Sequence, residues 1–119
     1  MGLAKINRLR SYRDFRQVYE SGKKYESAHL IIRALLDSEI VSNEPKIGIV
    51  VSQKVSKKAV TRNRIKRQIK GIIRGLLPQI DKGVKIVIIV KTTARECQFN
   101  QFLRELKELL LKANIIHGH

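Results

Sequence analysis

The sequence lacks most of what builds a disulfide framework, a cysteine-based metal site or a membrane anchor. Among its 119 residues are one cysteine, two prolines and no tryptophan. A single thiol, Cys97, forms no internal disulfide and supplies no cysteine-based zinc site. The longest apolar run, Ile86–Val90, is far shorter than the roughly 18 residues of a membrane span. The N-terminus also lacks a secretory signal, so we expect a cytoplasmic protein with one domain over residues 1–119.

Acidic residues are few, and their spacing does not indicate a catalytic centre. The ten acids are scattered, mostly in predicted turns or on outer helix faces, with no D-x-D or H-E-x-x-H pattern. Two-metal nucleases need converging carboxylates, and P-loop enzymes need a glycine-rich phosphate loop that this sequence lacks. His29 stands alone on a predicted strand, and His117 and His119 lie near the chain end. We therefore predict no catalytic residues and no metal ligands in this chain.

Positive charge is abundant instead. Twenty-five Lys and Arg residues against ten acids give a formal net charge of +15. A surface of this kind repels itself unless a polyanion binds, so the expected partners are nucleic acid, an acidic membrane or an acidic protein.

Hydrophobic periodicity and turn signals predict seven elements in the order α-β-β-β-α-β-α. Ser11 and Asp14 form a capping pattern for the first helix, and Pro78 ends the second. Thr92 and Thr93 offer a cap for the last helix. One sheet with helices packed on it is the economical arrangement. The predicted ranges are helices 12–21, 58–77 and 95–112, and strands 23–25, 29–36, 46–52 and 84–91.

The second predicted helix is strongly basic. From Gln53 to Arg74 there are nine basic residues and no acid. Ordinary surface helices mix signs, because like charges four residues apart cost about a few tenths of a kcal/mol each. A polyanion explains the pattern, since each neutralised phosphate releases counterions. On a helical wheel, the basic face lies beside an apolar Ile and Leu face and carries Arg62, Asn63, Lys66, Arg67, Lys70 and Arg74, with Arg64 further round.

Binding to a membrane surface is the alternative for a basic amphipathic helix. It is disfavoured because the apolar face has no aromatic residue and suits packing on a sheet. Four of the six aromatic residues lie in residues 1–25, among seven basic ones. Aromatic rings among cations are typical of single-stranded nucleic-acid binding, although Tyr12, Phe15 and Tyr19 also share one helix face and could belong to the core.

Three motifs together resemble the protein subunit of bacterial ribonuclease P. They are Asn7-Arg8-Leu9, the pattern D-F-x-x-V-Y-x-x-G from Asp14 to Gly22, and RNRIKR from Arg62 to Arg67. The resemblance covers nearly the whole chain. It implies an α+β fold, a two-layer α-β sandwich with the basic helix in a β-α-β crossover.

The resemblance also implies a function. The partners would be a catalytic RNA subunit that uses Mg²⁺ and precursor tRNA whose 5′ leader is removed, with no obligatory protein partner and no cofactor bound by the protein. A ribosomal-type or RNA-chaperone protein, and a self-sufficient metal nuclease, are the other hypotheses. The predicted RNA contacts are Lys54, Lys57, Lys58, Arg62, Asn63, Arg64, Lys66, Arg67 and Lys70, and the predicted leader cleft contains Phe15, Tyr19 and Arg33. Arg33 stands where some members of the family have an aromatic residue.

Overall fold

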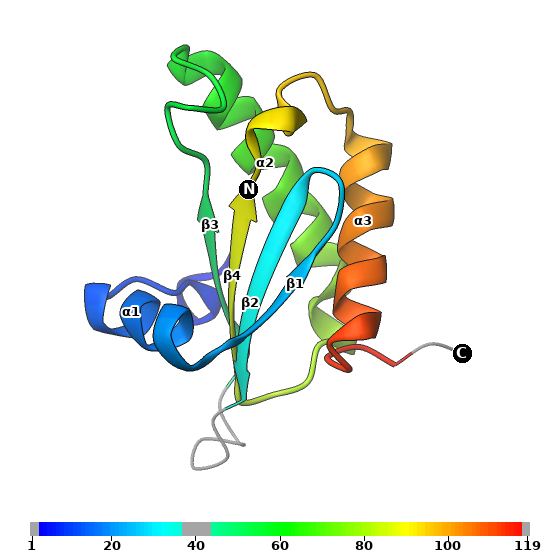
Figure 1. The fold of residues 1–119 in the computed structure, drawn as a ribbon. Coiled ribbons are helices and arrows are strands. Elements are labelled where there is room, and N and C mark those ends of the chain that lie inside the picture. Colours follow the sequence, from blue (N-terminus) through cyan, green and yellow to red (C-terminus); the bar gives the residue numbers. More distant parts are fainter. Residues whose placement is uncertain (1–2, 37–43, 118–119) are drawn as a thin grey trace.

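The computed structural model describes residues 3–36 and 44–117, and in them one four-stranded sheet carries three α-helices (Figure 1). The predicted α+β class and element order are confirmed. The connection between the predicted strands 29–36 and 46–52 lies largely outside the described residues. The main elements are α1 (Tyr12–Ser21), β1 (Lys23–Glu26), β2 (Leu30–Leu36), β3 (Lys46–Val50), α2 (Ala59–Leu76), β4 (Val84–Val90) and α3 (Phe99–Lys112).

The strands lie in the order β1-β2-β4-β3. β2 is antiparallel to both β1 and β4, while β3 is parallel to β4, with Ile47 opposite Ile86. The chain therefore reaches β4 from β3 through α2, which confirms the predicted β-α-β unit. Parallel neighbours need such a crossover, because a tight turn joins only antiparallel strands.

The central strand β4 separates two apolar clusters. Val84, Ile86, Ile88 and Val90 face the larger cluster, which α2 and α3 cover. Val87 and Ile89 face the smaller one, where α1 packs. Because successive strand residues point to opposite faces, the continuous apolar run at 86–90 serves both. Helix α1 thus adds a partial third layer to the predicted two-layer sandwich, and Figure 1 shows it on the opposite side of the sheet from α2 and α3.

The helix ends follow from local chemistry, with one correction. The Ser11 hydroxyl accepts a hydrogen bond from the Asp14 N–H at 3.0 Å, and α1 spans the predicted residues. The prediction that α3 begins near residue 95 with a threonine cap was wrong. Thr92–Ala94 form a 3₁₀ turn, and α3 starts after Gln98, whose N–H donates to Gln101 Oε1 at 2.8 Å.

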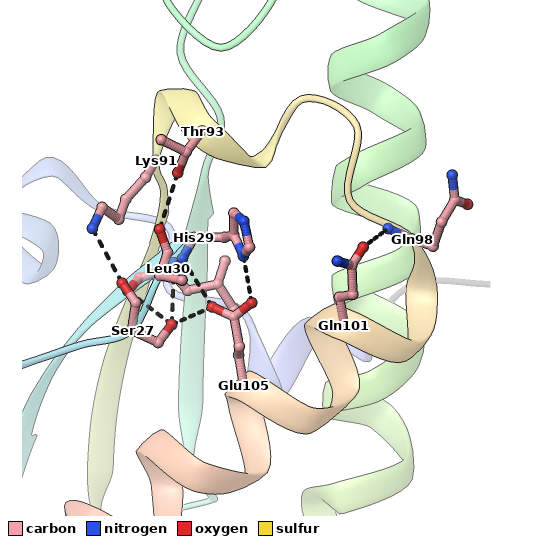
Figure 2. Close-up of polar contacts among 9 residues, drawn as sticks. Ser27, His29, Leu30, Lys91, Thr93, Gln98, Gln101 and Glu105 are labelled. Carbon is pink, nitrogen blue, oxygen red and sulfur yellow. Dashed lines mark hydrogen bonds and ion pairs between the residues drawn. The ribbon is translucent and has the colours of Figure 1, made fainter.

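A buried acid ties the β1–β2 turn to α3 (Figure 2). Glu105 is 4% exposed, although acids were expected mainly in turns and on outer helix faces. Its carboxylate accepts from the Ser27 hydroxyl, from the His29 N–H at 2.9 Å and from His29 Nδ1 at 2.6 Å. Burial raises the pKa of Glu105, but the hydrogen bonds from Ser27 and His29 outweigh burial, so its pKa lies below the ordinary value.

We predict that Glu105→Gln lowers the free energy of unfolding at neutral pH by roughly 1–3 kcal/mol, because the amide cannot accept all of these bonds. The pKa of Glu105 is lowered on folding, so the stability it contributes is complete above the unfolded pKa of 4.5. That stability is lost as pH falls through the lower folded pKa. Urea unfolding at several pH values measures it. This role would be contradicted if acid lowered the free energy of unfolding of Glu105→Gln by as much as that of the parent chain.

Candidate RNA interface

Helix α2 buries one face and presents its basic residues in three directions. The buried side chains are Ile65, Ile69, Ile72, Ile73 and Leu76, as the helical wheel predicts. Lys66 and Lys70 lie on the flank towards β3 and α1, because they line a groove with residues of both. Arg64 lies on the opposite flank, where it contacts the segment before α3. Asn63 and Arg67 are exposed between these flanks.

The groove beside β3 has a volume of about 170 Å³ and combines positive charge with an apolar floor. Its four charged lining residues are all basic, and no acidic side chain lines it. Two of the four, Arg8 and Arg10, were not among the predicted RNA contacts, although the basic N-terminal stretch contained the signal. The lining residues are Leu3, Arg8, Leu9, Arg10, Phe15, Ile47, Gly48, Ile49, Lys66 and Lys70.

The N-terminal segment forms one wall of this groove and is fixed to β3. The Asn7 side chain is buried and donates from Nδ2 to the Pro45 carbonyl at 3.0 Å. The Leu9 N–H donates to the Ile47 carbonyl at 3.0 Å, and Arg8 forms a parallel bridge with Ile47. The motif Asn7-Arg8-Leu9 therefore holds two arginines at the rim of the groove by attaching their neighbours to the sheet.

Phe15 forms part of the groove floor because β3 has a glycine beneath it. A Cβ atom on Gly48 would lie 2.5 Å from Phe15 Cζ, which is closer than two non-bonded carbon atoms approach each other. The ring therefore lies directly against the backbone of β3. It is half-buried and packs on the smaller cluster with Val18, which is fully buried. Phe15 thus belongs both to the core and to the groove.

The other two predicted cleft residues form a separate pair. Tyr19 is 40% exposed, one turn further along α1. The Arg33 guanidinium on β2 lies 5.8 Å from the centre of the Tyr19 ring and donates to the Tyr19 carbonyl at 3.1 Å. This distance and partner are those of a cation–π contact. Neither residue lines the groove that contains Phe15, so the structure associates Tyr19 with Arg33 but places the pair beside that groove.

Two arginines of the RNRIKR motif make contacts within the protein. Arg62 Nη1 donates to the Ser56 carbonyl at 2.9 Å. Arg64 donates from Nη1 to the Cys97 carbonyl at 3.3 Å and from Nη2 to the Arg95 carbonyl at 3.1 Å. Arg64 thereby fixes the segment before α3 against α2. The remaining predicted contacts are Lys54, Lys57, Lys58, Asn63, Lys66, Arg67 and Lys70, and their side chains form no hydrogen bond or ion pair with any described residue.

The described residues include no group of three or more His, Cys, Asp or Glu side chains that could hold a metal ion. His29 is paired with Glu105, and His117 contacts Asp81 at 3.1 Å, while His119 lies outside the described residues. Cys97 is buried just before α3, and burial raises the pKa of its thiol, which keeps it protonated. Within the described part of the chain, no helix has the length and apolar character to cross a membrane.

The internal hydrogen bonds of Arg64 and the exposure of Arg67 predict different effects of mutating the two arginines. Arg64→Ala should lower the free energy of unfolding by about 1–3 kcal/mol, because it leaves two carbonyls without their donor. Arg67→Ala is the matched control, since it removes an exposed charge from the same helix. It should change the free energy of unfolding by about 0.5 kcal/mol or less. It should also make the slope of log RNA affinity against log salt concentration shallower by roughly 0.7–0.9.

Thermal unfolding and RNA binding at several salt concentrations measure these effects. Suppose that Arg64→Ala reduces the slope as much as Arg67→Ala does and leaves stability unchanged. The Arg64 side chain would then contact RNA, and not the Arg95 and Cys97 carbonyls.

Known proteins share both the sequence and the fold. The chain is 57% identical to the ribonuclease P protein component of Rippkaea orientalis, with 100% of this chain and 95% of that protein covered. It is 53% identical to the component of Microcystis aeruginosa, with both chains covered in full. The structure of the Staphylococcus aureus RNase P protein matches with a TM-score of 0.84 at 26% identity, covering 95% of this chain and 100% of that one.

The RNase P protein from Thermotoga maritima matches with a TM-score of 0.77 at 29% identity, covering 93% of this chain and 98% of that one. The ribonuclease P family itself matches residues 3–114, which include every element of the sheet, the groove and the basic helix. On sequence and fold together, the chain belongs to the ribonuclease P protein family.

Proposed function

We propose that this chain is the protein subunit of ribonuclease P, and that it binds the catalytic RNA and the 5′ leader of precursor tRNA in the cytoplasm. The observation that carries the proposal is the groove beside β3, which residues of α1 and α2 also line. It places four basic side chains, and no acidic one, around an aromatic ring. Membership of the family supports the same conclusion.

The groove suits a single strand. Single-stranded nucleic acid is bound by rings that stack on bases and by cations that follow the phosphates. Phe15 supplies the ring, Lys66 and Lys70 supply cations from α2, and Arg8 and Arg10 supply them from the opposite wall. A tRNA leader is single-stranded RNA, whereas the body of tRNA is mostly paired. The groove therefore favours the leader over mature tRNA.

The exposed face of α2 suits a structured RNA. Asn63 and Arg67 are exposed, and Lys57 and Lys58 lead into the helix. Arginine binds phosphate through two parallel hydrogen bonds, and asparagine can reach a base edge or a 2′-hydroxyl. This face points away from the sheet, so it can dock on the catalytic RNA while the groove holds the leader.

Bond cleavage is assigned to the RNA subunit and its Mg²⁺ ions. The described acids are dispersed or paired with basic side chains, as Asp14 with Lys85 and Glu105 with His29. The protein contributes by neutralising phosphates that would otherwise repel one another as the two RNAs approach. This effect should matter most when Mg²⁺ is scarce.

A cleavage assay tests the proposal directly. Precursor tRNA is incubated with a bacterial ribonuclease P RNA, with this protein, or with both, at a Mg²⁺ concentration where the RNA alone is slow. Cleavage at the mature 5′ end should be fast only with both components. Binding of RNA without faster cleavage would favour a ribosomal-type or RNA-chaperone protein, and cleavage by the protein alone would favour a self-sufficient nuclease.

Phe15→Ala should weaken holoenzyme binding of precursor tRNA by roughly tenfold, the scale of removing one base–aromatic stack, and leave mature tRNA unaffected. Leu106→Ala is the control, because Leu106 on α3 is fully buried in the larger cluster, on the other face of the sheet from Phe15. It should lower the melting temperature without changing the ratio of the two affinities. Equal weakening of both RNAs by Phe15→Ala would show that Phe15 acts only in the core.

A further inference from the structure

Lys85 on β4 is a cation with an unusual position, beneath α1 on the sheet. Its side chain is only 12% exposed. Its Nζ donates to Asp14 Oδ1 at 3.3 Å and to Gln17 Oε1 at 3.1 Å. Lysine is seldom buried to this extent unless it is paired. Both partners belong to α1, so Lys85 connects the beginning of the interior strand β4 to the helix that carries Phe15 and Tyr19.

The surroundings of Lys85 make this pairing necessary. Its cross-strand neighbours are Leu35 on β2 and Lys46 on β3. Like charges on adjacent strands repel, and Lys46 Nζ is directed to the Ile6 carbonyl at 3.1 Å. The Asp14 carboxylate is thus the only acidic partner of Lys85 among the described residues.

Apart from Lys85, helix α1 is held on the sheet by the pair of Tyr19 with Arg33 and by a small apolar cluster. The cluster beneath it has only three buried members, Leu9, Val18 and Val87. With so few buried side chains, we expect the apolar contact alone to resist rotation of α1 about Val18 only weakly. Asp14 and Gln17 lie on either side of Phe15 in the sequence, so their bonds to Lys85 oppose that rotation. Phe15 has no free space to absorb it, because the ring already touches the backbone at Gly48.

We propose that Lys85 is a positioning residue for leader binding. By holding Asp14 and Gln17, it fixes the rotation of α1 and keeps the Phe15 ring on Gly48, where it forms the groove floor. Lys85 itself does not line the groove. The inference rests on the proposed function, since it assigns Lys85 to the same leader site.

Lys85→Met tests the inference, because methionine retains the apolar length and removes the charge. In the reconstituted holoenzyme, the affinity ratio of precursor to mature tRNA should fall by roughly 3- to 10-fold, the scale of coupling between contacting groups. Lys85→Arg should retain most of the ratio. Lys82→Met is the matched control, since Lys82 is 61% exposed and its only described ionic partner is Glu44 at 3.9 Å. It removes the same charge without touching α1 and should leave the ratio unchanged.

A second substitution separates positioning from stability. If Lys85 acts through Phe15, then adding Lys85→Met to Phe15→Ala should lower the ratio little further. Reductions that multiply in the double variant would overturn the inference, as would a Lys85→Met variant that weakens both RNAs equally. Failure of the proposed function looks different, because Phe15→Ala alone would then leave the ratio at its original value.

Discussion

Repulsion between like charges on one helix is the constraint on which the rest of this structure depends. Eighteen residues of α2 contain six cations and no acid, so no ion pair stabilises the helix along its own surface. Its isoleucine face, buried against the sheet and α3, stabilises it instead. Burial of a side chain of that size contributes about 1.5–3 kcal/mol, and five are buried. The apolar face thus offsets the repulsion and lets the helix carry six cations without an acidic neighbour of its own.

The sheet separates two tasks by its two faces. The α2 and α3 side supplies most of the apolar core and is closed by polar contacts such as Glu105 with Ser27 and His29. The α1 side has a small cluster and carries the groove. Because β3 is an edge strand beside β4, the N-terminal segment can pair with it and bring further arginines to the lysines of α2. The proposed RNA-binding groove therefore lies where the apolar core is smallest, and individual polar contacts such as Lys85 with Asp14 matter more there.

Local patterns in the sequence predicted the elements and the basic face. The Ile periodicity of α2, the β-branched strands and the Ser11 cap each depend on neighbours a few residues away. The partners of Arg64 could not be predicted, because they are carbonyls 31 and 33 residues further along the chain. The burial of Glu105 depends likewise on a turn 76 residues earlier. Arg8 and Arg10 were visible as charges, but only their position beside β3 makes them part of the groove. Binding of RNA by the predicted residues stays a prediction.

The central claim is that the groove holds leader phosphates through its cations, and salt dependence tests it most directly. The measurement is the slope of log affinity against log salt concentration for precursor and for mature tRNA, with the parent protein and with Lys66→Ala plus Lys70→Ala. The account predicts a steeper slope for precursor tRNA than for mature tRNA. In the double variant, the difference between the two slopes should shrink by roughly 0.7 for each leader phosphate that is no longer neutralised. An unchanged difference in the double variant would contradict it.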